Sequence, residues 1–154
     1  YNSKLSDNLG FDVGLYFLNY SNQTKFNTIE GYASLNYALA TKYPTVVSAK
    51  VNYTPDRNAY LPDPKNQDES AWYVTTQADI KLKPDLTLTP QVGYAFGDTF
   101  DQKRIGGLDE FLNYSISLTK SFNDGFSAKF SYVGVDLDNH DNKVILALNK
   151  SFSF

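Results

Sequence analysis

Apolar and polar side chains alternate along the C-terminal stretch NKVILALNKSFSF, which covers residues 142–154. One side of this stretch collects Val144, Leu146, Leu148, Phe152 and Phe154, and the other collects Lys143, Ile145, Ala147, Asn149, Ser151 and Ser153. Successive side chains of a β-strand point to opposite faces, so a period of two predicts a strand with one apolar and one largely polar face. Lys150 is the exception on the apolar side.

The same period of two recurs upstream in seven further segments. These lie at 9–20, 27–39, 45–53, 70–82, 85–96, 109–121 and 126–135. None of the segments has the 3.6-residue period of an amphipathic helix. The sequence therefore predicts an all-β fold of eight antiparallel strands.

The composition removes several classes of function. The chain has 154 residues, which is typical of one domain, and its formal net charge of −3 does not fit a nucleic-acid-binding surface. It has no cysteine and one histidine, which excludes a disulfide framework, a cysteine-based zinc site and a multi-histidine metal site. No apolar run reaches the roughly 18 residues of a transmembrane helix. The chain begins Tyr1-Asn2-Ser3 without a signal-peptide pattern, so we expect a processed or trimmed form of an exported protein.

Short and long connections alternate between the predicted strands. The short ones are 40–44, 83–85 and 122–125, and the last contains the turn-forming Asn123-Asp124-Gly125. The longer ones are 21–26, 54–69, 97–108 and 136–141. An even number of antiparallel strands, with short turns at one end and longer loops at the other, is typical of an outer-membrane β-barrel. Its strands need roughly 9–11 residues to cross the bilayer, which these segments provide.

Alternation alone does not decide which face of such a barrel points outward. A soluble barrel, such as a lipocalin, would hold the apolar face inside. Here that face has many large rings, among them Phe11, Trp72, Tyr94 and Phe130, which would overfill an eight-stranded interior. The opposite face is mainly Ser, Thr, Asn, Gln and Gly, whereas a water-exposed sheet normally has more Lys and Glu. Both observations favour an apolar face that points outward.

Aromatic residues also gather near both ends of the strands. Phe17, Tyr53, Trp72, Phe96 and Tyr132 lie toward the long loops, and Phe122, Phe126, Phe152 and Phe154 lie toward the short turns. Two aromatic belts are expected where a barrel crosses both membrane interfaces. Unpaired backbone groups are costly in hydrocarbon, so the sheet is expected to close. We therefore predict one transmembrane antiparallel up-and-down β-barrel domain over residues 1–154, in contact with the lipid of a bacterial outer membrane.

The C-terminal stretch resembles the signal by which bacterial outer-membrane barrels are recognised. Its residues here would be Leu146, Leu148, Phe152 and Phe154, and the resemblance implies the barrel-assembly machinery as a partner. Further stretches resemble the TorF-type family of proteobacterial porins. They are LGFDVGLY (9–16), SAKVNYTPD (48–56), LTLTPQVGY (86–94), and SYVGVDLD (131–138) followed by LNKSF (148–152).

The resemblance to the porin family implies passive passage of ions or small solutes through a polar lumen, without enzyme activity or a cofactor. Members of that family are longer, with further strand-like sequence before the part that matches 9–16. This chain is then either a short relative or the C-terminal part of a wider barrel. The alternative function is a non-conducting eight-stranded barrel that serves as a membrane anchor, an adhesion surface or a subunit of an envelope complex.

The predicted inward face collects charged, amide and tyrosine side chains. The candidate lumen-lining residues are Asp12, Tyr16, Glu30, Tyr32, Lys50, Tyr73, Gln77, Asp79, Gln91, Asn113, Lys129 and Lys143, with Lys81 on the same face. The charges either select ions in an open lumen or pair with one another and fill a narrow barrel. The three tyrosines form a constriction or a sugar-stacking platform, or they fill the barrel mouth.

Two connections hold other candidate residues. His140 lies in DLDNHD (136–141), and no serine can be assigned to it for the nucleophilic chemistry of a lipid-modifying enzyme. The same carboxylates could bind Ca²⁺, but the glycine of a Ca²⁺ loop is absent and His140 takes a ligand position. We expect a solvated hairpin tip with no catalytic or metal site. The charged loop 54–69 is either a binding surface for a partner or a variable loop.

Overall fold

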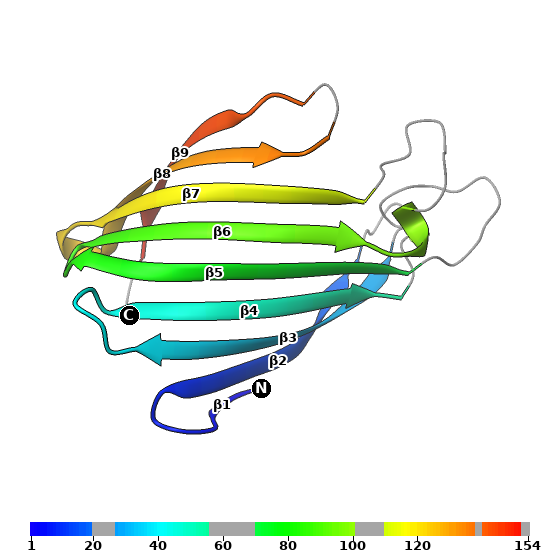
Figure 1. Ribbon diagram of the computed structural model, residues 1–154, viewed down its shortest axis with the longest axis horizontal. Coiled ribbons are helices and arrows are strands. Elements are labelled where there is room, and N and C mark those ends of the chain that lie inside the picture. Colours follow the sequence, from blue (N-terminus) through cyan, green and yellow to red (C-terminus); the bar gives the residue numbers. More distant parts are fainter. Residues whose placement is uncertain (20–26, 56–69, 101–109, 138–139, 152–154) are drawn as a thin grey trace.

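The computed structural model describes residues 1–19, 27–55, 70–100, 110–137 and 140–151 as one curved antiparallel sheet (Figure 1). Its nine strands lie side by side in the order of the sequence. They are β1 (Asn2–Lys4), β2 (Leu9–Leu18), β3 (Thr28–Leu39), β4 (Thr45–Thr54), β5 (Ala71–Lys83), β6 (Leu86–Phe96), β7 (Phe111–Ser121), β8 (Phe126–Val135) and β9 (Lys143–Lys150). Two short 3₁₀ turns, η2 (Asp98–Phe100) and η3 (Asn123–Gly125), follow β6 and β7.

The prediction of an all-β, antiparallel, up-and-down fold is confirmed, and eight of the nine strands correspond to the predicted segments. The sheet has one strand more than the eight segments that the alternation predicts. β1 pairs with β2 through residues 2–4 and 10–12, and its polar tripeptide is too short to show alternation. The last predicted strand, 142–154, is described as far as Lys150 in β9, and Phe152 and Phe154 lie outside the described residues. The described part of the chain holds no helix of the length and apolarity that crossing a membrane requires.

The register of the sheet assigns each side chain to one of two faces. Residues paired across antiparallel strands point to the same side, so one row of partners defines one face. The row Asn36, Ser48, Gln77, Gln91 and Ser115 belongs to what we call the inner face. The adjacent row Leu35, Ala49, Thr76, Val92 and Tyr114 belongs to the outer face. The alternation in the sequence is therefore carried coherently across β3 to β7.

Polar side chains on the inner face are more buried than apolar side chains on the outer face, the reverse of the distribution in a soluble protein. On the inner face of β7 and β8, Ser117 and Ser131 are only 3% and 6% exposed. Next to Ser117 on the outer face, Ile116 is 48% exposed, and on β9 Leu146 is 68% exposed. Curvature crowds the side chains of the concave face together, so the polar face is the concave one. A soluble protein folds by removing apolar side chains from water, and this sheet presents them over one whole face instead.

The connections divide the sheet into two ends. Residues 5–8, 40–44, 84–85 and 122–125 connect strands at one end, on the left of Figure 1. The connections after β2, β4, β6 and β8 are longer and belong to the other end, which we call the long-connection end. Among the described residues, β1 and β9 are the edge strands of the sheet.

Candidate functional site

The twelve candidate lumen residues all lie on the inner face. The register aligns Asp12 with Lys50 and Asn113 through their strand partners, and it aligns Gln77 with Gln91 and Lys143. Tyr32 and Tyr73 share the next row toward the long-connection end, and Lys129 lies in the row of Lys81. The twelve positions therefore share one surface, although they do not form one cluster.

Four of them come together on β2, β3 and β4. The rings of Tyr16 and Tyr32 stack at 5.0 Å between centroids, and the ammonium of Lys50 lies 4.2 Å from the centre of the Tyr32 ring. The Tyr32 hydroxyl donates a hydrogen bond of 3.1 Å to Asp12. A cation over an aromatic face is stabilised by the ring quadrupole, and no described carboxylate forms an ion pair with Lys50. Tyr73 lies apart from this group.

Glycines make room for the inner tyrosines. A Cβ atom on Gly14 would lie 2.6 Å from the Tyr32 ring, and one on Gly93 would lie 2.5 Å from the Tyr73 hydroxyl. Carbon atoms do not approach that closely without displacement, so each ring occupies the space that a side chain would fill. The tyrosines therefore lie flat along the sheet, and the glycines fix their orientation.

Within the described residues, the inward charges are not joined to one another as ion pairs. Asp79 accepts hydrogen bonds from Thr89 at 2.7 Å and from Gln77 at 3.1 Å. In the described parts of the chain, the ion pair present joins Lys120 on β7 to Asp85 in the β5–β6 turn. The hydrogen bond from Lys120 lowers the pKa of Asp85 below its ordinary value of 3.8. The geometry does not support a barrel interior filled by paired charges.

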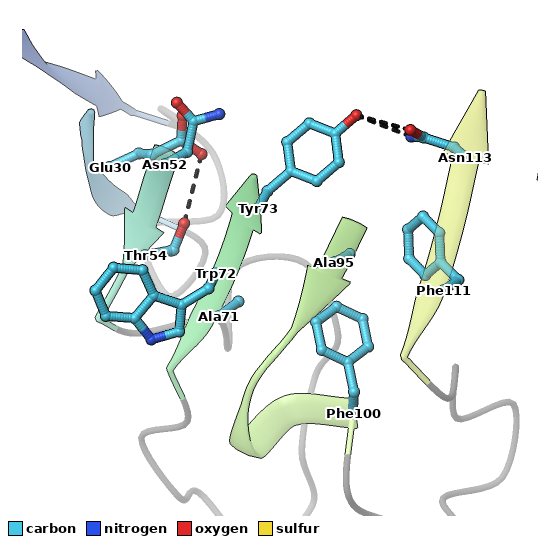
Figure 2. A pocket seen from close by; sticks show the side chains of 10 residues that line it. All are labelled: Glu30, Asn52, Thr54, Ala71, Trp72, Tyr73, Ala95, Phe100, Phe111 and Asn113. Atoms are coloured by element: carbon cyan, nitrogen blue, oxygen red, sulfur yellow. Dashed lines mark hydrogen bonds between the residues drawn. The ribbon is translucent and has the colours of Figure 1, made fainter. Parts of the chain in front are cut away.

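A cavity of about 320 Å³ lies on the inner face at the long-connection end (Figure 2). It is lined from five adjacent strands and η2 by Glu30, Asn52, Thr54, Ala71, Trp72, Tyr73, Ala95, Phe100, Phe111 and Asn113. Figure 2 shows Glu30, Asn52 and Thr54 grouped on one side and the rings of Phe100 and Phe111 on the other. The cavity thus has a polar wall and an aromatic wall.

Phe100 is the most buried residue of this cavity. It is 3% exposed and packs with Ala71 and Ala95, and its ring meets that of Phe111 edge-on at 5.9 Å. Gly97 turns the chain toward the inner face with a φ of 127°, a conformation that glycine adopts without strain. The amide of Phe100 then donates to the Gly97 carbonyl at 2.9 Å, which closes η2. A cluster of apolar side chains therefore interrupts the polar face.

The polar wall has hydrogen-bond acceptors to spare. The Thr54 hydroxyl donates to the Glu30 carboxylate at 3.4 Å. Tyr73 and Asn113 satisfy one another, because the Asn113 amide donates to the Tyr73 hydroxyl at 2.8 Å. The Oδ1 atom of Asn52 is buried and accepts no hydrogen bond from the part of the chain that the structure describes. A carboxylate accepts about four hydrogen bonds in total, so Glu30 and Asn52 leave several acceptor positions open to the cavity.

Rings also gather on the outer face at the long-connection end. Tyr53 and Trp72 lie 4.4 Å apart between ring centroids, Trp72 and Phe96 lie 6.4 Å apart, and Tyr94 stacks on Phe96 at 5.6 Å. The Tyr94 hydroxyl donates to Glu110, beyond the end of the sheet. At the opposite end, Phe122 and Phe126 lie 5.5 Å apart. These contacts form a continuous aromatic belt at one end and an aromatic pair at the other.

The remaining predicted residues are placed as follows. Leu146 and Leu148 lie on the outer face of β9 and are 68% and 64% exposed. His140 is exposed, and the described residues include no group of His, Cys, Asp or Glu that could hold a metal ion. Of the charged loop 54–69, residues 56–69 are outside the described part of the chain.

Sequence reasoning missed the cavity and Phe100. A signal was present, because Ala71 and Ala95 are small apolar residues on a largely polar face and Phe111 pairs with Ala95. Alternation within single strands does not show that a residue beyond β6 folds back onto these positions. Only the register of β5, β6 and β7 brings the three together.

Comparison with known proteins gives a family and no function. No curated protein and no solved structure matches the chain. Residues 1–152 match the family described as "Bacterial protein of unknown function (Gcw_chp)". The match covers nearly the whole chain, and the chain therefore belongs to the bacterial Gcw_chp family.

Proposed function

We propose that this chain is an outer-membrane β-barrel, or the greater part of one, that gives ions or small solutes passive passage. The observation that carries the proposal is the inverted burial of the sheet. Ser117 is 3% exposed on the inner face, whereas Leu146 is 68% exposed on the outer face. Large apolar patches on a protein surface mark contact with another apolar phase, and a face that extends over eight strands fits lipid.

The aromatic belt on the outer face supports the same proposal. Tyr and Trp side chains favour membrane interfaces, where the ring is in an apolar layer and the polar atom reaches water. The outer belt of Tyr53, Trp72, Phe96 and Tyr94 has this arrangement, since the Tyr94 hydroxyl bonds to Glu110 beyond the strand. In lipid the edges of the sheet would have to be satisfied, so the proposal includes closure through β9 or through additional strands. The resemblance to TorF-type porins is consistent with this function.

The proposed mechanism needs no turnover and no cofactor. The inner face offers hydroxyl, amide and carboxylate groups that can replace the hydration of a passing solute, which hydrocarbon cannot do. Its charges include Asp79 and Lys50, which have neutral partners in the structure. Charges that are not neutralised by one another leave a field that discriminates between cations and anions.

Single-channel recording of the chain refolded into planar bilayers tests the proposal. We expect discrete conductance steps that grow with salt concentration. Asp79→Asn removes an inner-face carboxylate and should shift the reversal potential in a salt gradient toward anion selectivity. Glu110→Gln is the matched control, because Glu110 bonds to the outer-face Tyr94 and should leave selectivity unchanged. Folded, membrane-inserted protein without conductance would contradict passive passage.

A non-conducting barrel is the second candidate, and a specific observation favours it. Phe100 covers the inner face at the long-connection end, and the stacked pair of Tyr16 and Tyr32 lies on the same face. These side chains narrow the space above the sheet. The chain would then serve as a membrane anchor, an adhesion surface or a subunit of an envelope complex, and bilayer recordings would be silent.

A further inference from the structure

We propose that the cavity under Phe100 binds the primary ammonium group of a small organic solute. The inference deepens the proposed function, on which it rests, by naming the class of solute that the inner face would recognise. The cavity lies on the inner face at the long-connection end, where five strands contribute to its lining. A solute that crosses between the two ends of the sheet would meet it.

The charge of the cavity selects for cations. Glu30 is the single carboxylic acid among the ten lining residues, and none of the ten is a Lys, Arg or His. Within the described residues, Glu30 forms no ion pair, and its carboxylate accepts one hydrogen bond, from Thr54 at 3.4 Å. A carboxylate near a low-dielectric wall attracts a cation more strongly than one in open water. Among the described residues, the cavity therefore has a negative charge without a compensating partner.

The hydrogen-bonding capacity of the cavity selects for a donor. Asn52 Oδ1 is buried without a partner among the described residues, while Tyr73 and Asn113 are already bonded to each other. A buried acceptor without a hydrogen bond is costly, so a ligand that donates to it gains free energy. An alkylammonium group has three donors and no acceptor, which matches Glu30 and Asn52 together.

The aromatic wall selects for an apolar body on the same solute. Phe100 and Phe111 meet edge-on, and the small side chains of Ala71 and Ala95 lie beneath them. A volume of about 320 Å³ accommodates a ring or short alkyl chain beside the ammonium group. Outside the cavity lining, the ammonium of Lys50 lies 4.2 Å from the Tyr32 ring, so rings of this face can form cation–π contacts.

Calorimetric titration of the refolded chain in detergent micelles with benzylammonium tests the inference. Benzyl alcohol and benzoate, which share the ring, are the matched ligands and should bind at least about tenfold more weakly, because hydrogen bonds to charged groups are the stronger ones. Glu30→Gln should weaken benzylammonium binding at least about tenfold. Glu110→Gln, the same substitution at the same end but bonded to the outer-face Tyr94, should leave binding unchanged.

The ligand series uses unmodified protein, so the inference stays testable even where Glu30→Gln prevents folding. Equal binding of benzylammonium and benzyl alcohol would overturn the ammonium site. Complete displacement of benzylammonium by potassium chloride at constant ionic strength would also overturn it, because the cavity would then be a site for simple inorganic cations. Micelle binding does not require conduction. Selective binding without conductance would refute passage alone, and conductance without selective binding would refute this inference alone.

Discussion

At the scale of single residues, the face on which a side chain lies sets the cost of giving it a charge. Ile116 is 48% exposed on the outer face, and the adjacent Ser115 lies on the inner face. In a membrane barrel, Ile116→Lys should lower the free energy of unfolding by roughly 2–4 kcal/mol near the bilayer midplane. Ser115→Lys should cost less, since the inner face is polar. Urea unfolding of both variants from lipid vesicles measures the difference, and equal losses would refute the assignment of faces.

The approach of Tyr32 to Gly14 gives a second prediction for single residues. In Gly14→Ala, the new Cβ would lie 2.6 Å from the Tyr32 ring, so the ring must move and its hydrogen bond to Asp12 must break or stretch. Overpacking of this kind costs about 1–3 kcal/mol in unfolding free energy. Gly31→Ala is the control, because its Cβ would make ordinary contact with Leu15 at 3.6 Å. Similar stabilities for the two variants would show that the Tyr32 ring is not fixed.

At the scale of elements, the ion pair between Asp85 and Lys120 ties the β5–β6 turn to β7. The pKa of Asp85 is lowered below 3.8 by the hydrogen bond from Lys120. A carboxyl group whose pKa is lower in the folded state stabilises that state above its unfolded pKa. This stabilisation is lost as pH falls from near 3.8 through the folded pKa. The urea midpoint of the native chain should therefore fall more steeply below pH 4 than that of Asp85→Asn, and parallel curves would exclude the ion pair.

The η2 turn is expected to stabilise the long-connection end through Phe100. Phe100→Ala removes a side chain that is 3% exposed and leaves a void above Ala71 and Ala95, which costs about 3 kcal/mol in unfolding free energy. Its single-channel conductance should rise, because the ring covers part of the inner face. Phe96→Ala, which shortens the outer belt, is the control for stability and should leave conductance unchanged. Reduced conductance in Phe100→Ala would contradict this role.

The same elements show how far the sequence predicts this fold. Strict alternation predicted the eight long strands, because apolar side chains must recur at every second residue of a strand that presents one face to an apolar phase. β1 was missed because three polar residues have no measurable period. η2 was missed because Phe100 follows a long strand, and its partners Ala71 and Phe111 are brought to it only by pairing between strands. Contacts within one strand were predictable, and contacts across several strands were not.

At the scale of the whole molecule, the sheet has its polar side chains on the inner face and its apolar side chains on the outer face, the reverse of a soluble barrel. The faces were assigned from ring size and from the scarcity of charges, and the burial of Ser117 and Ser131 agrees with that assignment. The bonds within the inner face depend on partners in other strands, as between Asp79 and Thr89 or Tyr73 and Asn113, and could not be read from one strand. The function proposed here follows from the faces, and the solute class follows from those longer-range contacts.

Spin-label accessibility in lipid vesicles tests the orientation of the sheet most directly. The chain has no cysteine, so single cysteines can be introduced and labelled one at a time over residues 112–116 of β7. We expect high collision rates with oxygen, which concentrates in lipid, at Leu112, Tyr114 and Ile116. High collision rates with a water-soluble nickel complex are expected at Asn113 and Ser115. A reversed alternation, or none at all, would contradict an outer face in contact with lipid.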